Sequence, residues 1–539
     1  MRFQPHQHQN VPTLVGVILI AAVVTPAHTS PIIDLGYAQY QGSVDASTNV
    51  TSFLGIRYAA APIGDLRFRA PQAPPIVAGI QNATEEPDQC YQAAIGSSPS
   101  NPLRARAPTT VSSEDCLSLS VFFPSDAQGA PEGPLPVLVF IHGGGYFSGS
   151  SSLYPGSELL AQSNRGLVVV GIQYRLGVFG FLPGVEVKKH GSLNAGLLDQ
   201  EFALRWVNRH ISKFGGDPDR VTIWGQSAGA GSVLQHIIAN NGQTTPQLFR
   251  GAITSSTFLP SQYHYNDRIP ELVYREVVEQ TNCTSAASSM ACLRAVDVNT
   301  LESANMNMNV AAFFGTCLVV PVVDGELITQ RPTLALAQGK VNGKALLAVT
   351  NPFEGTQFVN QSTGPTANAT QYALDLFPDF GAAQAHRVGA LYSGLGTQLF
   401  QTTTVLGESL FICPTYYLLR AFSGRAFKGE FAVPPATHGV DSLYYFPSLV
   451  SMFDIPVFNN TAFTNAFAQI FTSFAISLDP NIKVSDTITP RWDKWYKGNT
   501  EMLFNKTETD LPLVGPITTS EALLERCRFW DSVGDLTGQ

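Results

Sequence analysis

The apolar positions of this chain fall into short runs of valine, isoleucine and leucine, separated by longer segments of helical period. Such runs are typical of strands buried on both faces of a sheet, because neither face then requires alternating polar side chains. Five buried strands are predicted, at Val137–Ile141, Leu167–Tyr174, Val221–Trp224, Gly251–Ser255 and Ala345–Thr350.

A long helix is predicted between two of these strands. The segment Asp199–Phe214 carries apolar residues at the spacing of one helix face, and Gly215 and Gly216 end it. Strands that alternate with helices of this length are typical of βαβ units. The pattern therefore predicts an α/β fold with a large central, mainly parallel sheet flanked by helices.

The strand signals continue along the chain without a break that would divide it into domains. Pro- and Ser-rich stretches at Gly96–Ser113 and Asn360–Thr370 are interpreted as surface loops, since strand signals occur on both sides of each. Although 539 residues would suffice for several domains, we predict a single domain over residues 30–539 with loop and helix insertions.

Residues 1–29 predict a secretory signal peptide. Arg2 precedes an apolar run at Leu14–Val24, and the small residues that follow place the cleavage point between Ala27 and Ser30. The run of eleven residues is too short for a bilayer, which takes about 20; a retained membrane anchor is the alternative. We expect a secreted, extracellular protein without an integral membrane segment.

The charge of the chain argues against one class of partner, and its sequons agree with secretion. Charged residues make up 14% of the chain and the net charge is −9, so no nucleic-acid partner is expected. Asn-X-Ser/Thr sequons predict glycosylation at Asn49, Asn82, Asn282, Asn360, Asn368, Asn459 and Asn505.

Seven cysteines predict disulfides and one unpaired thiol in an oxidising compartment. Short separations suggest two local bridges, Cys90 with Cys116 and Cys283 with Cys292. Each bridge would stabilise the fold by about 2 to 4 kcal/mol, mainly by restricting the unfolded chain. Spacing alone leaves open the pairing of the other three, which are Cys317, Cys413 and Cys527.

A serine lies at a tight corner in the sequence VTIWGQSAGAGSV. The strand Val221–Trp224 leads directly into Gly225, and a small-residue segment of helical character follows Gly229. The two glycines leave room for a sharp turn that exposes Ser227 beside a helix N-terminus, which is the geometry of a nucleophile elbow. The alternative is a glycine-rich helix start with an N-capping serine.

A serine nucleophile needs a histidine base, and the histidine needs a carboxylate to orient it. His438 lies in the proline- and glycine-containing loop VPPATHGVD and is the predicted base, whereas His386 lies within a helical pattern. Glu354 follows a predicted strand in NPFEG and is the predicted acid. Asp324 in VPVVDGE is the alternative acid, and its simpler interpretation is a turn aspartate.

Backbone amides suited to an oxyanion are predicted directly after the strand Val137–Ile141. The chain continues there as HGGGY, and its glycines allow backbone N–H groups to approach a substrate closely. Gly144, Gly145 and Ala228 are the three predicted donors of this oxyanion hole. A plain hairpin turn is the alternative interpretation of the glycines.

Together these motifs resemble the type-B carboxylesterase/lipase family of cholinesterase-like α/β-hydrolases, in particular its secreted fungal members. The motifs that carry the resemblance are SEDCLSLSVFFP, HGGGY, YRLGVFGFL, FGGDPDRVTIWGQSAGA, VPVVDGE, NPFEG and THGVD. The resemblance implies an α/β-hydrolase fold and ester hydrolysis by a triad of Ser227, Glu354 and His438. It implies no cofactor, and the chain has neither an H-E-x-x-H motif nor a Cys/His cluster of zinc spacing, so no metal is expected.

The resemblance also implies contacts that hold the fold together. It implies two ion pairs of structural rather than catalytic importance, Arg67 with Glu114 and Arg175 with Asp199. It leaves Cys317 free and implies three disulfides, which are Cys90 with Cys116, Cys283 with Cys292 and Cys413 with Cys527.

Departures from the family narrow the substrate. Cholinesterases carry a tryptophan about ten residues before the SEDCL cysteine as a platform for quaternary ammonium; Arg106 stands there in this chain, so choline esters are not expected. Gly315 and Cys317 replace phenylalanines that narrow the acyl pocket of acetylcholinesterases, which predicts room for bulkier acyl groups. The loop between Cys90 and Cys116 encloses 25 residues, fewer than the flap of the family's yeast lipases, which favours an esterase over a strongly interface-activated lipase.

We therefore predict a secreted serine carboxylic ester hydrolase that acts through an acyl-enzyme on a small-molecule or lipidic ester with a medium to bulky acyl group. It is predicted to be a monomer or a weak dimer. A lipase and a hydroxycinnamoyl (feruloyl) esterase are the alternatives within this class. A non-catalytic, cholinesterase-like adhesion module is the alternative from another class.

Overall fold

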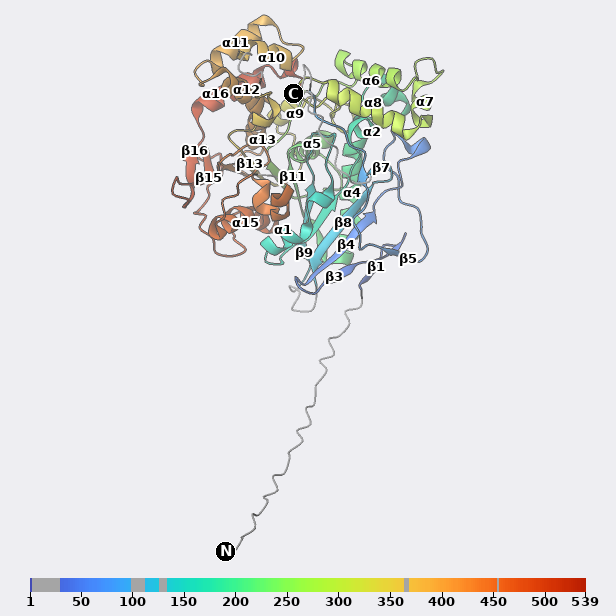
Figure 1. The fold of residues 1–539 in the computed structure, drawn as a ribbon, viewed down its shortest axis with the longest axis vertical. Coiled ribbons are helices and arrows are strands. Elements are labelled where there is room, and N and C mark those ends of the chain that lie inside the picture. Colours follow the sequence, from blue (N-terminus) through green and yellow to red (C-terminus); the bar gives the residue numbers. More distant parts are fainter. Residues whose placement is uncertain (2–29, 98–111, 126–132, 363–367, 453–454) are drawn as a thin grey trace.

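A computed structural model describes residue 1 and residues 30–97, 112–125, 133–362, 368–452 and 455–539 of the chain. Residues 2–29, which make up nearly all of the predicted signal peptide, lie outside the described residues. So do Arg106 and most of the predicted surface loop Gly96–Ser113. Figure 1 shows a twisted central sheet with helices on both sides and further helices above it. Within the described ranges, no helix combines the length and the apolar character that a membrane crossing requires.

Eleven of the described strands form one sheet, in the order β16-β15-β14-β13-β12-β11-β9-β10-β8-β4-β3. The pairings from β10 through β15 are parallel, and those at both edges are antiparallel. The predicted large, mainly parallel sheet is therefore confirmed, and its central strands are the five predicted ones: β9 (Leu135–Ile141), β10 (Val168–Ile172), β11 (Gly216–Gln226), β12 (Gly251–Ser255) and β13 (Ala345–Thr350).

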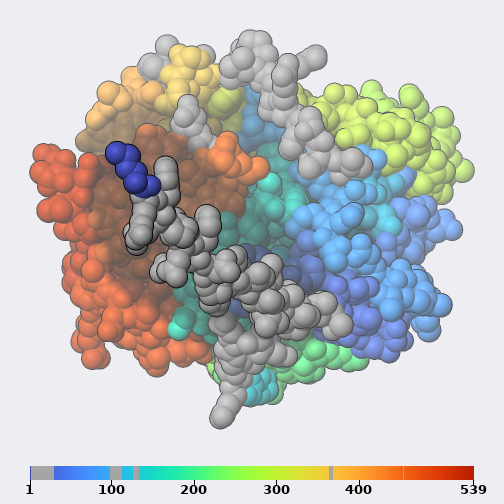
Figure 2. Space-filling model, turned by 60° about the horizontal axis from the view of Figure 1, so that its bottom comes forward, coloured from blue at the N-terminus to red at the C-terminus, as the bar shows by residue number. Residues whose placement is uncertain are grey.

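The outer strands extend this sheet on both sides. They are β3 (Ser43–Asp45), β4 (Val50–Arg57), β8 (Ser118–Pro124), β14 (Ala426–Phe431), β15 (Thr500–Lys506) and β16 (Pro512–Thr518). Figure 2 shows the consequence for the surface, with N-terminal segments in blue and C-terminal segments in red on opposite sides. Short strands form two smaller sheets, which comprise β1 (Ile32–Asp34), β2 (Gln39–Gln41) and β5 (Ile80–Asn82), and β6 (Gln89–Cys90) with β7 (Ser112–Ser113).

The central strands are buried on both faces because alternate side chains enter two hydrophobic cores. Leu138 and Phe140 of β9 enter the core that α1 (Gly156–Gln162) and α15 (Thr461–Ser477) cover. Val139 and Ile141 enter the larger core on the opposite face, which α4 (Ala195–His210) and α5 (Ala228–Gly242) cover. Apolar side chains on both faces explain why these strands show no polar alternation in the sequence.

Two groups of helices lie at the top of the molecule in Figure 1. The first comprises α6 (Arg268–Gln280), α7 (Ser289–Ala295) and α8 (Val298–Ala311), and the second α10 (Ala369–Leu376), α11 (Ala382–Tyr392) and α12 (Gln398–Gly407). A π-helical turn at Glu408–Ile412 joins α12 to α13 (Cys413–Ala421). The other helices are α2 (Gly177–Phe181), α3 (Val185–His190), α9 (Pro332–Ala337), α14 (Ser442–Tyr445), α16 (Glu521–Ser532) and α17 (Gly534–Thr537).

The largest differences between predicted and observed element boundaries occur in α4 and β11, whereas β9 and β10 differ from the prediction by one or two residues at an end. The helix α4 begins at Ala195, four residues before the predicted start at Asp199, because Asn194 takes a left-handed conformation (φ 52°) immediately before it. A single 3-10 turn, Ile211–Phe214, then continues α4 to the predicted end. The strand β11 extends back to Gly216, with a register shift between Gly216 and Val221.

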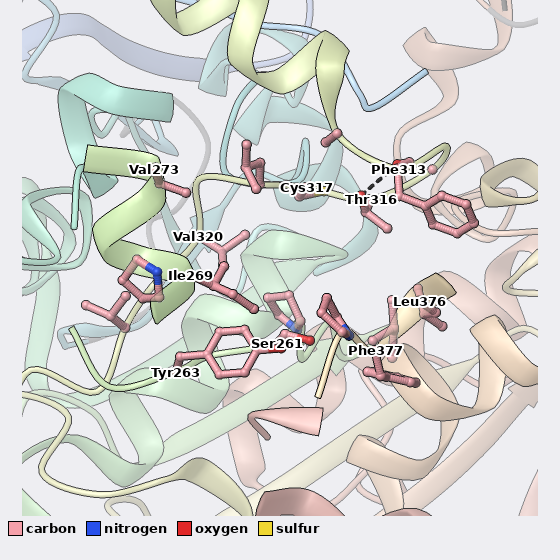
Figure 3. A pocket seen from close by; sticks show the side chains of 18 of the residues that line it. Ser261, Tyr263, Ile269, Val273, Phe313, Thr316, Cys317, Val320, Leu376 and Phe377 are labelled. Atoms are coloured by element: carbon pink, nitrogen blue, oxygen red, sulfur yellow. Dashed lines mark hydrogen bonds between the residues drawn. The ribbon is translucent and has the colours of Figure 1, made fainter. Parts of the chain in front are cut away.

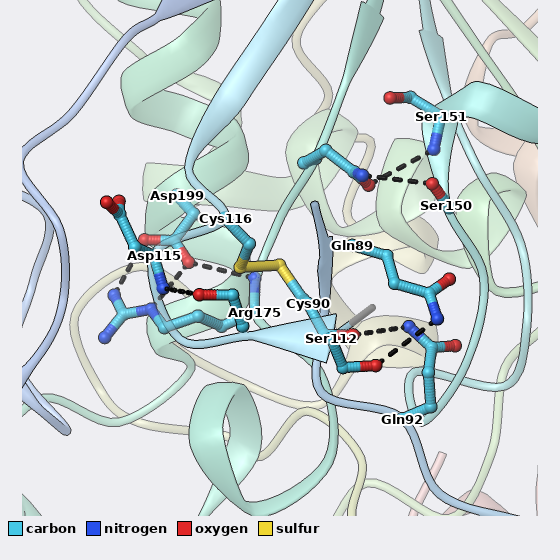
Figure 4. The surroundings of a disulfide bond; sticks show 12 residues. Gln89, Cys90, Gln92, Ser112, Asp115, Cys116, Ser150, Ser151, Arg175 and Asp199 are labelled. Carbon is cyan, nitrogen blue, oxygen red and sulfur yellow. Dashed lines mark hydrogen bonds and ion pairs between the residues drawn. A yellow bond between two sulfur atoms is a disulfide. The ribbon is translucent and has the colours of Figure 1, made fainter. Parts of the chain in front are cut away.

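Three disulfides join described residues, Cys90 to Cys116, Cys283 to Cys292 and Cys413 to Cys527, and Cys317 is free. Figure 4 shows the first bridge close to the ion pair of Arg175 and Asp199, whose side-chain atoms approach to 2.7 Å. The ion pair of Arg67 and Glu114 is also formed, at 2.6 Å. Both ion pairs are buried or nearly so, as expected of contacts that hold loops in place.

Removal of the long-range disulfide is expected to destabilise the protein more than removal of a local one. The Cys413–Cys527 bridge joins residues 114 apart, so its loss should lower the free energy of unfolding by about 5 kcal/mol. The Cys283–Cys292 bridge joins residues 9 apart, and the same chain-entropy relation gives about 2.5 kcal/mol. Denaturant unfolding of the two Cys→Ser double variants measures the difference, and equal losses would contradict it.

Candidate active site

Ser227 lies at the corner between β11 and α5 in a conformation that few non-glycine residues adopt, with φ 58° and ψ −125°. The corner closes only because both flanking glycines lack a side chain. A Cβ on Gly225 would lie 2.2 Å from the carbonyl carbon of Gly229, and one on Gly229 would lie 2.0 Å from the carbonyl oxygen of Ile141. The Ser227 hydroxyl faces His438 rather than the first amides of α5, which contradicts the N-capping alternative.

His438 and Glu354 meet Ser227 at the carboxyl end of the parallel strands. The Nε2 atom of His438 lies 2.8 Å from Ser227 Oγ, and its Nδ1 atom lies 2.6 Å from Glu354 Oε2. Their loops are joined where the Phe353 amide donates to the Ala436 carbonyl at 3.2 Å. The structure thus brings together the three side chains that the sequence singled out.

The two alternative residues lie elsewhere. His386 is exposed on α11. Asp324 is buried in a turn, where its Oδ1 atom accepts hydrogen bonds from the amides of Glu326 and Ile328 at 2.7 and 3.0 Å. These contacts agree with the interpretation of Asp324 as a turn aspartate.

A second buried carboxyl group lies behind Glu354, and the sequence reasoning missed it. The Asn351 amide donates to Glu354 Oε1 at 2.8 Å, and Asn351 Nδ2 donates to Asp441 Oδ1 at 3.1 Å. The Tyr445 hydroxyl donates to the other oxygen of Asp441 at 2.9 Å. Asp441 follows His438 by three residues in THGVD, and only the folded loop shows that its side chain turns inward.

Burial raises the pKa of the Asp441 carboxyl from 3.8 to about 6, and the negative charge of Glu354 adds to the rise. A carboxyl with a raised pKa in the folded state favours folding while it is protonated, so its contribution is lost as the pH rises through about 6. Relative to Asp441→Asn, which cannot ionise, the wild type should lose about 3 kcal/mol of stability between about pH 4 and pH 7.

Thermal unfolding of the wild type and Asp441→Asn across this pH range measures the effect as a widening gap between their midpoints. Asp219→Asn is the matched control because Asp219 is exposed, and its midpoint should follow the wild type at every pH. Parallel curves for wild type and Asp441→Asn would show that Asp441 does not titrate in this way.

Two of the three residues that carry the predicted oxyanion amides, Gly144 and Gly145, line the same cavity as Ser227. Gly144 and Gly145 have φ values of 108° and 63°, and a Cβ on Gly144 would lie 2.1 Å from the carbonyl oxygen of Ser148. Both glycines line the cavity with Ser227 and His438. Across the described part of the chain, the amides of Gly144, Gly145 and Ala228 donate to no protein acceptor, so they are available to a ligand.

The cavity that contains Ser227 is large and mainly apolar. It has a volume of about 460 Å3, and the rings of Phe358 and Phe411 flank the His438 ring with centroids at 5.0 and 4.5 Å. Cys317 lines it too, and burial raises the pKa of its thiol to about 12. The Cys317 thiol therefore stays protonated and is no competing nucleophile.

A second apolar cavity of about 210 Å3 adjoins the Ser227 cavity. It shares Phe258, Gly315, Cys317 and Leu410 with the Ser227 cavity. Figure 3 shows the side chains of the second cavity, with Cys317 above Val320 and Tyr263 below. Within the described residues, no cluster of His, Cys, Asp or Glu has the arrangement of a metal site.

The fold and this site define a class of protein, an α/β-hydrolase that hydrolyses carboxylic esters. Residues 29–530 match the family described as "Carboxylesterase family". The chain belongs to this carboxylesterase family and is a carboxylic ester hydrolase.

Individual relatives agree with this assignment. The chain is 30% identical to "Carboxylesterase patB" of Aspergillus clavatus over 96% of its own length and 98% of that protein. It is 34% identical to "Secreted lipase 1" of Botryotinia fuckeliana, over 62% of its own length and 61% of that lipase. The crystal structure of Aspergillus niger EstA superposes with a TM-score of 0.83 at 30% identity, over 95% of this chain and 99% of that one. The similarity to enzymes over nearly the whole chain leaves no support for a non-catalytic adhesion module.

Proposed function

We propose that the protein is a secreted serine esterase in which Ser227 is the nucleophile, His438 the base and Glu354 the acid. The observation that carries the proposal is the continuous pair of contacts, 2.8 Å from Ser227 to His438 and 2.6 Å from His438 to Glu354. Buried Glu354 accepts from His438 Nδ1, which leaves the lone pair of Nε2 directed at the serine hydroxyl.

The reaction proceeds in two acyl-transfer steps. Ser227 Oγ attacks the ester carbonyl carbon while its proton passes to His438 Nε2, and the amides of Gly144, Gly145 and Ala228 stabilise the oxyanion. The carbon–oxygen bond to the alcohol then breaks, and His438 returns the proton to the leaving alcohol. Water repeats the sequence on the acyl-enzyme and releases the carboxylic acid.

The acyl group is proposed to be medium-sized to bulky. The apolar cavity at Ser227 measures about 460 Å3, and the small residues Gly315 and Cys317 form part of its wall. The structure accommodates only glycine at position 315, because a Cβ there would lie 1.8 Å from the carbonyl oxygen of Phe358. No larger side chain can therefore narrow the cavity from this position. A lipase function is the second candidate, since a relative is named a secreted lipase.

A chain-length series separates the two candidates. Initial rates on soluble p-nitrophenyl esters from acetate to palmitate should peak above butyrate, and methyl ferulate tests the hydroxycinnamoyl alternative. A steep rise in rate when a triacylglycerol passes its solubility limit would favour the lipase function. A preference for acetate over every longer acyl group would refute the medium to bulky acyl assignment.

Secretion and glycosylation are part of the same proposal. The seven sequon asparagines are all exposed or half-buried in the structure, and the protein contains disulfides. N-terminal sequencing of protein from the culture medium should begin at residue 28, 29 or 30. Treatment with an endoglycosidase should lower its mass by several glycans, and an unchanged mass would contradict glycosylation.

A further inference from the structure

A cleft of about 740 Å3 lies beside the C-terminal half of α4 and shares no residue with the Ser227 cavity. One wall is the face of α4 that carries Phe202, Arg205, Trp206 and Arg209 at helical spacing. The facing wall is the extended segment 71–76, which contains prolines. Its volume is within the range of small-molecule sites in proteins.

The walls of the cleft are held in place by hydrogen bonds. The Trp206 indole donates to the Tyr37 hydroxyl at 3.0 Å, and that hydroxyl donates to the Arg57 carbonyl at 2.7 Å. The segment 71–76 is fixed at both ends, since the Ala60 amide donates to the Gln72 carbonyl and the Val77 amide donates to the Tyr37 carbonyl. A preformed cleft loses little conformational entropy when a ligand binds.

In the described chain, the charged side chains that line the cleft are those of Arg205 and Arg209, and the lining contains no carboxylate. His210 lines the cleft as well. Arg205 is neutralised by Glu201 at 2.6 Å, whereas Arg209 is exposed and, among described residues, has no ion-pair or hydrogen-bond partner. Burial, together with the positive charges of Arg209 and Lys213, lowers the pKa of His210 to about 4. His210 is therefore neutral at pH 7, and Arg209 is the one charge in the described lining that has no counter-charge.

We infer that this cleft binds an aryl carboxylate, a flat ring that carries one carboxylate group. The guanidinium of Arg209 offers the planar pair of N–H donors that fits a carboxylate. Tyr37 and Trp206 line the same cleft, and the parts of their rings that face it provide apolar surface for the aromatic body of the ligand.

The site is separate from the proposed catalytic centre. The strand β1, which leads to Tyr37, lies at the bottom of the molecule in Figure 1, whereas α12, which contributes Leu406 to the lining of the Ser227 cavity, lies near the top. His210 also precedes the start of β11, and Ser227 follows its end. Binding at the cleft therefore does not depend on the proposed triad.

Isothermal titration of the secreted protein with cinnamate, and with cinnamyl alcohol as its uncharged analogue, tests the inference. Cinnamate should bind at least about tenfold more tightly than the alcohol, because only the acid can pair with Arg209. Arg209→Glu should weaken cinnamate binding by about tenfold or more and leave esterase activity unchanged. The matched control is Arg275→Glu on α6, which reverses an exposed charge away from the cleft and should bind cinnamate as the wild type does.

Three results would overturn the inference. They are wild-type affinity for cinnamate in Arg209→Glu, an equal loss in Arg275→Glu, and no binding to the wild type at about 10 mM cinnamate. Ala73→Trp, which places an indole in the cleft from the facing wall, provides a second variant that does not alter charge. It should abolish cinnamate binding if the ligand occupies this cleft, and unchanged binding would place the ligand elsewhere.

Discussion

Replacement of Ser227 by alanine is expected to lower kcat for a carboxylic ester by about 10⁵- to 10⁶-fold. The variant keeps the oxyanion amides and the apolar cavity, but it has no oxygen that can form the acyl-enzyme. Alanine also lacks the hydroxyl that lies 2.8 Å from His438 Nε2, so His438 has no proton to accept. The residual rate should be that of direct water attack aided by the oxyanion hole. Initial rates with a p-nitrophenyl ester measure the loss.

A neighbouring serine provides the control. Ser232 lies on the same helix α5, is fully buried and accepts a hydrogen bond from Gln200 Nε2 at 2.9 Å. Ser232→Ala should cost about 1 to 2 kcal/mol of stability and leave kcat within about threefold of the wild type. A p-nitrophenyl phosphonate should react covalently with the proposed nucleophile and release one equivalent of p-nitrophenol from the wild type and from Ser232→Ala. It should release none from Ser227→Ala. A Ser227→Ala variant with more than about a hundredth of wild-type kcat would exclude Ser227 as the nucleophile.

The central part of the fold could be predicted from the sequence because its signals are local. Strands such as β13 are continuous apolar runs in the sequence. The tight turn at Ser227 is indicated by Gly225 and Gly229, and in the structure a Cβ at either position would clash with the backbone. The start of α4 could not be predicted, because it depends on the left-handed backbone of Asn194. The spacing of apolar residues does not indicate such a backbone conformation. The pairing of Cys413 with Cys527 likewise did not follow from spacing, since 114 residues separate them.

The site could be predicted only in part, for a similar reason. Glu354 follows the predicted strand Ala345–Thr350, and His438 lies in a loop that contains prolines and a glycine. His386 lies instead in a helical pattern, and Asp324 has a simpler interpretation as a turn aspartate. Asp441 gave no comparable signal. Its importance comes from burial and from Asn351, which lies 90 residues earlier in the chain. Contacts of this kind arise when separate loops converge, and one sequence does not record them.

Replacement of Glu354 by glutamine is expected to lower kcat by about 10⁴-fold and to change KM much less. Glu354 is fully buried, and its Oε2 atom lies 2.6 Å from His438 Nδ1. A neutral amide of the same shape fills the space, but it cannot stabilise the imidazolium that forms when His438 takes the serine proton. It can also donate its N–H to Nδ1, which would place the histidine proton on Nε2 and remove the base from Ser227.

The control for this variant is Asp324→Asn, because Asp324 was the other candidate acid. Its carboxylate is hydrogen-bonded in a turn to Asn194 and to two backbone amides, so the substitution should lower stability and leave kcat within about threefold. Steady-state rates of both variants with one soluble ester, corrected for the folded fraction, make the comparison. If Glu354→Gln keeps more than about a tenth of wild-type kcat, or Asp324→Asn loses as much as Glu354→Gln, the carboxylate that orients His438 is not Glu354.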